Sequence, residues 1–310
     1  MPPQNSTIVL LDHLQNILPI SRWDLWKKHI PWTPPNPPYA LEQSTDKGMK
    51  MVACRPIQQG ELIALERPLV VSRTDIAIAE DQRSSGIFYQ AALSGLSSAA
   101  RASIVSLHNA FGPEQDPILG TLLTNQHPVT IPESPQTEYS GLFPTLCRAN
   151  HDCSPNTNFF FNPRTFTGQF HAVRAIEKDE EITALYCELA ASREERRAEL
   201  SEHYKFLCEC KTCALPSALV EQSDARRRAI ADLIPLMHQG TYSDDMSVAR
   251  IEELLEWATH EGLYALYAEL LIYGYGLAIK LGAPAFAQKW SQLAAVAFRV
   301  LDGADSPRFG

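Results

Sequence analysis

The apolar and polar positions divide the chain into a strand-rich part and a helical part. Between residues 49 and 73, two apolar runs of the length typical of β-strands flank the turn-forming sequence Gln58-Gln59-Gly60. Residues 142–187 return to short apolar runs, interrupted by Asn162-Pro163 and Thr167-Gly168, which predicts a hairpin or two. These two segments are therefore expected to build small sheets.

The two strand-like segments are separated by a stretch of different character. Residues 86–123 are rich in alanine, leucine and serine with helical spacing, which predicts one or two inserted helices. The segment 125–141 that follows is polar and contains three prolines, so it is predicted to be irregular.

From Ser192 onward the pattern is helical. Ser192 precedes Glu195 by three residues, which predicts a capping box at a helix start. Farther along, amphipathic spacing predicts four more helices, at 218–238, 247–260, 262–281 and 284–301. Ser247 is placed to cap the second of these, and Gly282 and Pro284 mark a stop and a restart. A tetratricopeptide-like array is one interpretation, although no clean repeat period is visible.

The first forty residues follow neither pattern. A short amphipathic stretch through Trp23 and Trp26 leads into residues 31–40, where five prolines disfavour a helix and predict an extended arm. The apolar stretch near the start has no basic flank before it, so a signal peptide is not expected. No run reaches the roughly 18 apolar residues that a transmembrane helix needs, so no membrane association is expected.

Composition narrows the class of protein. The 310 residues are 45% hydrophobic, which is enough for a packed core and argues against a disordered chain. Acidic residues outnumber basic ones by 36 to 27, so the chain has a formal charge of −9. This balance argues against direct nucleic-acid binding as the main function, and it suits a basic peptide partner.

The placement of the cysteines indicates a metal site. Three of them lie within six residues, and a total of seven at modest density does not resemble a disulfide scaffold. Zinc prefers thiolate ligands in a closed tetrahedron, so Cys208, Cys210 and Cys213 need one more partner. The candidates are a histidine or one of Cys54, Cys147, Cys153 and Cys187. Cys153 stands out because it lies in a loop-like sequence, whereas the other three are interpreted as small buried apolar residues.

Segments in a fixed order carry a family resemblance. The sequences N-H-D-C-S-P-N at 150–156, E-E-I-T-A-L-Y at 180–186 and Y-K-F-L-C-E-C-K-T-C at 204–213 resemble the second half of a SET domain and its post-SET zinc loop. Residues 46–69 resemble the first SET segment, and the helical insert and tail resemble the SMYD-like branch and its fungal relatives. No second cysteine-rich block is present to form the MYND zinc finger of SMYD proteins.

The resemblance implies an α+β fold with small curved sheets and a pseudoknot, in which one C-terminal segment threads under a loop. It also implies a division of the chain into a proline-rich arm at 1–40, a SET domain at 41–207 with a helical insert at about 76–125, a post-SET zinc loop at 208–216 and a helical, tetratricopeptide-like domain at 217–310.

On this resemblance the chain is a protein-lysine methyltransferase that uses S-adenosylmethionine and a structural Zn²⁺. The expected zinc ligands are Cys153, Cys208, Cys210 and Cys213. Tyr186 and Tyr204 are the expected catalytic residues, with the Tyr186 hydroxyl orienting the substrate amine and Tyr204 lining the lysine channel. Methyl transfer requires alignment of nitrogen, methyl and sulfur and a neutral amine, and a dry channel beside a cationic cofactor lowers the pKa of lysine.

The resemblance also assigns cofactor contacts. The residues that match the family's binding positions are Lys47, Gly48, Met49, Asn125, Asn150, His151, Tyr186 and Phe206. Three glycines of the family pattern are replaced, by Asp46, Lys50 and Asp179. The run Arg226-Arg227-Arg228 is interpreted as a solvated helix face.

Three kinds of function fit this sequence. The first is methyl transfer to a lysine of a histone or another protein. The second is a SET fold that has lost transfer activity and acts as an interaction module, and the third is a SET fold adapted to small-molecule biosynthesis. The expected partner is therefore a lysine-containing protein or peptide, with a small molecule as the alternative. The protein is expected to be an intracellular monomer in the cytoplasm, the nucleus or both.

Overall fold

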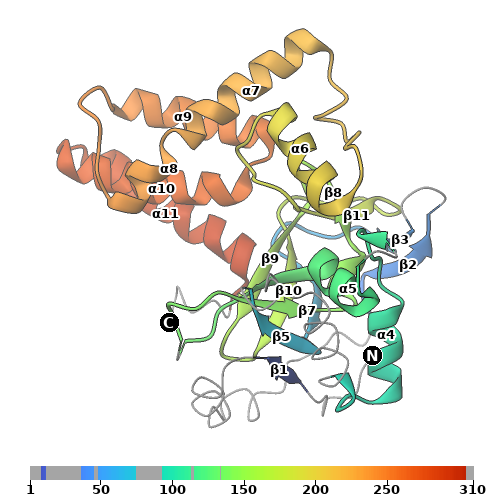
Figure 1. Ribbon diagram of the computed structural model, residues 1–310. Helices are drawn as coiled ribbons and strands as arrows, with labels where there is room; N and C mark the ends of the chain where they lie inside the picture. Colours follow the sequence, from blue (N-terminus) through green and yellow to red (C-terminus); the bar gives the residue numbers. More distant parts are fainter. Residues whose placement is uncertain are drawn as a thin grey trace.

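In the computed structural model, residues 8–11, 36–44, 48–74, 93–112, 115–132 and 134–304 are described. Within these ranges, short strands form three small sheets and the chain beyond Ser192 is helical (Figure 1). The predicted α+β class is therefore confirmed. Trp23, Trp26, Lys47, most of the proline-rich arm and residues 75–92 of the predicted insert lie outside the described residues.

The sheet that carries the candidate site joins strands from distant parts of the sequence. Its order is β2 (Tyr39–Gln43), β3 (Met49–Ala53), β11 (Glu181–Ala184) and β8 (Asn150–His151). β11 pairs antiparallel with β3 and parallel with β8, so that Ala184 lies opposite His151. The segment that leads to Tyr186 is thus held beside the Asn150-His151 pair by backbone hydrogen bonds.

The other two sheets complete the strand region. One is antiparallel, in the order β4 (Leu62–Glu66), β10 (Thr167–Ala172) and β9 (Thr157–Asn162). The other has the order β1 (Val9–Leu11), β5 (Val70–Arg73), β7 (Tyr139–Leu142) and β6 (Gln126–Val129). Side chains from all three sheets pack around Phe143 and Phe170, both fully buried. Burial of such aromatic side chains supplies much of the stability of this region.

The strands agree with the sequence pattern at one hairpin and differ from it in two other places. The predicted hairpin is confirmed as β9 and β10. The second apolar run is two strands instead of one, because Pro68 lacks an N–H donor and separates β4 from β5, which join different sheets. Segment 125–141 is irregular only in its middle, since β6 and β7 at its two ends pair with each other and β5 extends their sheet. The pairing with a distant strand cannot be recognised from the local pattern of apolar and polar residues.

Two helices of the predicted insert are described. α4 (Ser98–Val105) begins at the cap Ser97, and α5 (Pro117–Asn125) begins at the cap Asp116. Their apolar faces pack with Leu69, Val70 and Leu142 in a second cluster. The insert therefore covers one face of the sheet that contains β5 and β7.

The capping box predicted at Ser192 is confirmed at the start of α6 (Arg193–Tyr204). Five further helices follow, which are α7 (Ser217–Ala231), α8 (Ile234–Gln239), α9 (Val248–Glu261), α10 (Tyr264–Lys280) and α11 (Pro284–Asp302). The predicted helix at 218–238 is two helices, because Pro235 cannot donate the hydrogen bond that a continuous helix needs. The predicted Ser247 cap and the restart at Pro284 are confirmed.

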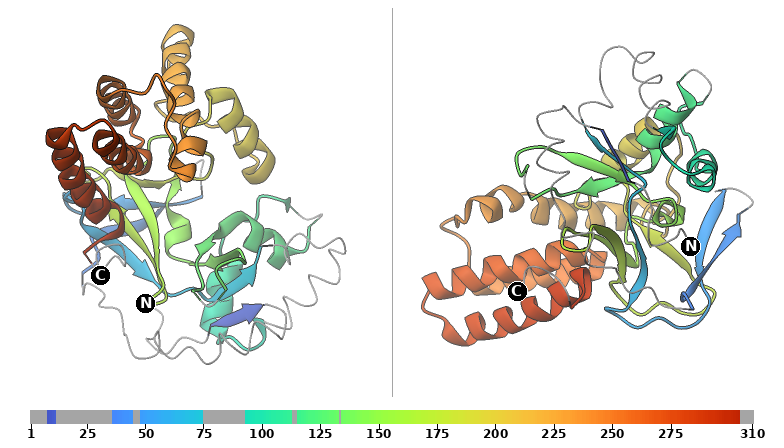
Figure 2. Two further views of the ribbon diagram at one scale, coloured as in Figure 1. Left: turned by 90° about the vertical axis from the view of Figure 1, so that its left-hand side faces the viewer. Right: turned by 90° about the horizontal axis from the view of Figure 1, so that it is seen from below.

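The C-terminal helices have their own apolar core. Trp290 lies at its centre, fully buried among leucines of α9 and α10. α11 also contacts β9 and β10, so these helices lie against one side of the strand region (Figures 1 and 2). Within the described chain, every helix is too short or too polar to span a bilayer.

Candidate active site and metal centre

Four cysteine sulfurs from two distant segments lie together. The Sγ atoms of Cys153, Cys208, Cys210 and Cys213 are all within 4.8 Å of one another. The Sγ of Cys153 is 3.8 Å from that of Cys208 and 3.5 Å from that of Cys213. Four thiolates bound tetrahedrally to zinc at ~2.3 Å lie about 3.8 Å apart, whereas a disulfide requires about 2.05 Å. The spacing therefore fits a zinc tetrahedron and excludes disulfides within the cluster.

A buried arginine strengthens this fit. Arg196 on α6 is only 1% exposed, and its Nη2 lies 3.8 Å from the Sγ of Cys213. Its Nε has no hydrogen-bond partner, and the carboxylate of Asp224 is 4.0 Å from its Nη1. Burial opposes the charge, but the thiolates of Cys153 and Cys213 raise the pKa of Arg196. A zinc ion with four thiolates carries two negative charges, which is what a buried guanidinium requires nearby.

His151 connects the cysteine cluster to the strand that bears Tyr186. The backbone N–H of Tyr186 donates to Nδ1 of His151 at 3.1 Å, so the ring proton is on Nε2. Nε2 lies 3.2 Å from the Sγ of Cys153 and donates to it. A protonated Nε2 cannot bind a metal, so His151 is a partner of a ligand and not a ligand. A hydrogen bond from His151 to the Cys153 sulfur would orient that sulfur towards a bound metal, as hydrogen-bond partners of metal ligands commonly do.

The two predicted catalytic tyrosines lie side by side. Their ring centroids are 4.8 Å apart with an interplanar angle of 32°. The Tyr186 hydroxyl donates to the carbonyl oxygen of Ala149 at 2.7 Å. Burial raises the pKa of Tyr186, and burial together with the charge of Glu199 raises that of Tyr204 to about 12. Both hydroxyls are therefore protonated at neutral pH and act as hydrogen-bond donors.

The predicted cofactor residues near β3 and β8 also come together. The Asn150 amide nitrogen donates to the Glu181 carboxylate at 2.8 Å and lies 3.4 Å from the Met49 carbonyl oxygen. Gly48 precedes Met49 with a φ of +73°, and no atom lies within 4 Å of a Cβ built there. Glycine is needed at this position for its left-handed backbone, and it leaves open space beside the strand.

Two other predicted cofactor residues, Asn125 and Phe206, lie outside the strands β3 and β8. The Asn125 amide nitrogen donates to the carbonyl oxygens of Thr121 and His108, at 2.7 and 2.6 Å, and so it is used within its own helix and the preceding loop. The Asn125 carbonyl oxygen accepts from the Cys147 thiol at 2.8 Å. Phe206 is 37% exposed, and its ring centroid lies 6.2 Å from that of His151. Asn125 therefore contacts Cys147, three residues before Asn150, and neither of these two hydrogen bonds of its side-chain amide goes to Asn150 itself.

Several sequence interpretations are wrong at the level of single residues. Cys54 is exposed rather than buried, because it lies just beyond the end of β3. Cys187 is buried but is not simply apolar packing, since its Sγ lies 3.9 Å from the Nε2 of His151. Arg227 is fully buried, so the Arg226-Arg227-Arg228 run is not a uniformly solvated face. Asp179, which replaces a family glycine, keeps a left-handed backbone with a φ of +67°.

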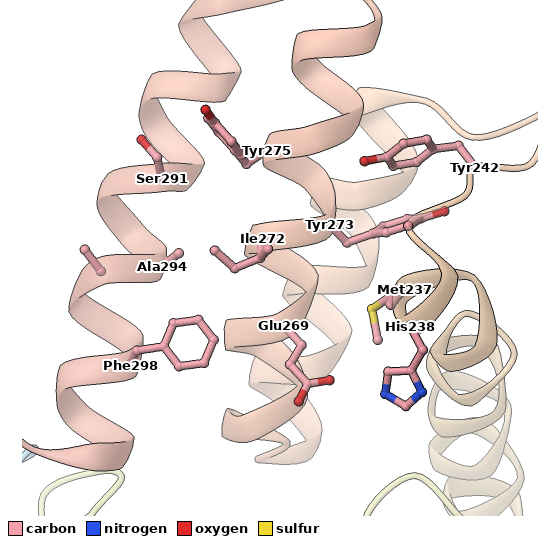
Figure 3. Close-up of a pocket in the computed structure, with 12 residues that line it drawn as sticks. Met237, His238, Tyr242, Glu269, Ile272, Tyr273, Tyr275, Ser291, Ala294 and Phe298 are labelled. Carbon is pink, nitrogen blue, oxygen red and sulfur yellow. The ribbon is translucent and has the colours of Figure 1, made fainter. Parts of the chain in front are cut away.

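Two cavities lie outside this cluster. One, of about 230 Å³, is bordered by strand-region residues such as Ala184 and Leu185 and by Tyr264 and Ala265 of α10. The other, of about 640 Å³, lies among the C-terminal helices, where Phe298 of α11 points towards α10 and Ile272 of α10 points towards α11 (Figure 3). None of the site residues predicted from the sequence lines either cavity.

Comparison with known proteins agrees with this geometry. Residues 48–187 match the family model described as SET domain. A protein of Schizosaccharomyces pombe named histone-lysine N-methyltransferase set5 is 34% identical over 194 residues, which cover 62% of this chain and 56% of that protein. Human histone-lysine N-methyltransferase SMYD3 is 40% identical over 73 residues, covering 24% of this chain and 17% of that protein.

A plant relative shows the same partial coverage. Histone-lysine N-methyltransferase ASHR1 of Arabidopsis thaliana is 43% identical over 77 residues, or 24% of this chain and 15% of that protein. The chain thus spans little more than half of the set5 relative and smaller shares of the others. The matched segment contains β3 to β11, the Asn150-His151 pair and Tyr186. The chain therefore contains a SET domain, in residues 48–187.

Proposed function

We propose that this protein transfers a methyl group from S-adenosylmethionine to a lysine side chain of a protein. The single observation that carries the proposal is the convergence of Tyr186, Tyr204 and the Asn150-His151 strand beside the four-cysteine cluster, within a SET domain. The names of the three relatives described above, each a histone-lysine methyltransferase, agree with this choice. They favour it over an inactive interaction module and over small-molecule chemistry.

The cofactor supplies an activated methyl group on a positively charged sulfur. The residues proposed to hold it are Gly48, Met49, Asn150, His151 and Phe206, together with Lys47 and Asn125 from the family pattern. Gly48 leaves open space beside β3, and the exposed ring of Phe206 offers a face to a cation. The Glu181 carboxylate holds the Asn150 amide in place. The backbone of Asn125 is joined to the turn before Asn150 by the hydrogen bond from the Cys147 thiol, which keeps it near the other proposed cofactor residues.

The tyrosines are proposed to position the substrate amine. Their hydroxyls stay protonated at neutral pH, so neither takes the ammonium proton. Lysine has an ordinary pKa near ~10.4, and burial beside another cation lowers it. As the amine enters this environment its proton passes to water, and the unprotonated nitrogen is left as the nucleophile. Tyr186 and Tyr204 align it, which is where near-attack positioning lowers the barrier.

The metal is proposed to be structural. Cys153 follows the Asn150-His151 strand, whereas Cys208, Cys210 and Cys213 follow Tyr204 and Phe206. A Zn²⁺ bound to all four fixes these two segments relative to each other, and its closed shell leaves no position for substrate. Zinc would supply folding free energy and not chemistry.

The substrate is proposed to enter beside α10. The cavity of about 230 Å³ there is bordered by Leu185, next to Tyr186, and by His127, whose imidazole pKa is lowered to about 4 by burial. Its described lining residues include no lysine or arginine, and a neutral His127 does not repel a cationic side chain. A lysine-containing peptide therefore meets no like charge on this path.

Binding and turnover of the zinc-loaded chain test the proposal. We expect calorimetry to detect S-adenosylmethionine binding, and purified core histones to accept methyl from labelled cofactor. Tyr186→Phe should lower kcat by about 10²-fold, or change the number of methyls added, with cofactor affinity nearly unchanged. Tyr275→Phe, on the exposed side of α10, is the matched control and should behave as the unaltered chain.

Absence of cofactor binding by the zinc-loaded chain would contradict the methyl-transfer proposal. Equal loss of cofactor affinity and kcat in Tyr186→Phe would instead contradict the assigned role of the hydroxyl. We also propose that the protein acts inside the cell, in the nucleus or cytoplasm, where histones are found, and imaging of a tagged chain tests this.

A further inference from the structure

Three consecutive arginines on α7 have three different environments. Arg228 is exposed, and Arg226 is half-buried with its guanidinium 2.6 Å from the Glu261 carboxylate. Arg227 is 0% exposed, although arginine is among the residues least often buried. A fully buried guanidinium is retained only where its donors are satisfied and its charge is paired.

The contacts of Arg227 lead away from its own helix. Its Nη1 donates to the Leu189 carbonyl oxygen at 2.6 Å, and its Nη2 to the Cys153 carbonyl oxygen at 3.2 Å. The same Nη2 lies 3.4 Å from the Ser154 hydroxyl oxygen. Leu189 comes three residues after Tyr186, and Cys153 is the zinc ligand contributed by the strand segment. One side chain therefore contacts the chain beyond Tyr186 and the turn beyond His151.

Glu261 completes the arrangement from α9. Its carboxylate is 3.2 Å from Arg227 Nε and accepts from Ser223 Oγ at 2.5 Å, and its carbonyl oxygen accepts from Ser154 Oγ at 2.7 Å. Gly262 follows with a φ of +70°, and a Cβ there would lie 3.0 Å from that of Ser154. The end of α9 is thus fitted against the turn that carries Cys153.

We propose that Arg227, held by Glu261, is a positioning residue for the methyl-transfer site, through which the C-terminal helices hold Cys153 and the segment after Tyr186 in register. The expected effect of Arg227 on methyl transfer rests on the proposed function, whereas its expected effect on the position of Cys153 does not. Without the guanidinium, the Cys153 and Leu189 carbonyl oxygens lose a buried donor, and the turn after His151 and the chain after Tyr186 are no longer tied to α7.

The first test measures zinc release from the full-length, zinc-loaded chain to a chromophoric chelator. Loss of a group that orients a metal ligand typically costs about 10–100-fold in metal affinity. We expect release to be at least about tenfold faster in Arg227→Met, and unchanged in Arg228→Met, the matched control one residue away. Arg227→Lys keeps the charge but not the fork of donors, so its rate should lie between the two.

A second variant separates positioning from general stability. Arg227→Met removes the donor of two buried carbonyl oxygens and one of the two cations paired with the Glu261 carboxylate, which keeps Arg226 as its ion-pair partner, so the chain is destabilised. Arg227→Met combined with Glu261→Gln removes the remaining buried charge but also the ion pair with Arg226, so only part of the lost melting temperature should be recovered. Zinc release should stay fast, and S-adenosylmethionine affinity and kcat should stay low, because the C-terminal helices no longer bond to the Cys153 and Leu189 carbonyl oxygens.

Release at the unaltered rate in the double variant, or equal rates in Arg227→Met and Arg228→Met, would overturn the inference. Failure of the unaltered chain to bind S-adenosylmethionine while it retains zinc would contradict only the proposed function. The zinc-release comparison would still decide the role of Arg227.

Discussion

The strand region and the C-terminal helices are stabilised in different ways. In the strand region, strands of two to six residues are joined by buried polar side chains such as Asn156, whose amide bonds both the backbone and the hydroxyl of Thr183 on β11. In the helical region, long helices pack through leucines and aromatics around Trp290. Polar bonds demand particular residues, whereas apolar packing tolerates many substitutions of similar volume. The strand region, which depends on such polar bonds, is also the region that the SET-domain family model matches.

Metal removal is the change expected to separate the two regions most. The free energy of zinc binding to a structural site is on the order of 10 kcal/mol, and it is coupled to folding. Chelation, or Cys208→Ser, should abolish cofactor binding and expose amides in 150–156 and 204–213 to hydrogen exchange. The helical core around Trp290 should keep its protection. Equal loss of protection in both regions would show that they unfold as one unit.

Trp290→Ala probes the other side of the comparison. Removal of a fully buried tryptophan leaves a cavity and typically costs about 3–5 kcal/mol, which denaturant titration measures. Trp257→Ala, at a half-buried tryptophan of α9 whose ring faces Arg250 at 4.9 Å, should cost less. If Trp290→Ala released zinc as fast as Cys208→Ser does, the strand region and the helical region would not be independent in stability.

Glu66 gives the strand region a pH dependence of its own. This buried carboxylate accepts from Thr145 and Leu146 at the start of the turn that precedes Asn150, and burial raises its pKa from 4.5 to about 7. The folded chain therefore binds this proton more tightly than the unfolded chain. The contribution of Glu66 to stability is present below pH 4.5 and is lost as the pH rises towards 7.

Glu66→Gln should remove this dependence. The rise of this pKa from 4.5 to about 7 corresponds to about 3 kcal/mol over the whole pH range, of which roughly 2.5 kcal/mol falls between pH 5 and pH 8. The unfolding free energy of Glu66→Gln relative to the unaltered chain should therefore rise by up to that amount between these two pH values. Denaturant titration at the two pH values measures it. Glu61→Gln, on a half-buried carboxylate paired with Arg55, is the control and should show no rise of this sign. A pH-independent difference for Glu66→Gln would exclude a raised pKa.

The helix cap at Ser192 is expected to have the smallest effect. Ser192→Ala removes the side-chain acceptor of the capping box, which costs about 1 kcal/mol. Ser201→Ala, at an exposed position inside the same helix, should be neutral or slightly stabilising. Because α6 lies between the two regions, an effect confined to zinc release, with no change in melting temperature, would assign this cap to the cysteine cluster instead.

Local chemistry carried much of the helical fold and three of the proposed zinc ligands, whereas the tyrosines and the cofactor residues were assigned by the family resemblance. Ser192, Ser247 and Pro284 mark helix starts because a cap or a missing N–H acts within one turn of its own residue. Three cysteines within six residues similarly state a metal preference without reference to the rest of the chain. These interpretations needed no knowledge of distant contacts.

Features that depend on distant partners were invisible or misjudged. The strands β6 and β7 exist because each pairs with the other and β5 completes the sheet, although the segment 125–141 is largely polar and contains three prolines. Arg227 looks like its neighbours in sequence, and only the orientation of α7 against the Cys153 turn buries it. Burial and strand pairing are properties of the assembled chain, since the same residue is solvated or enclosed according to what folds against it.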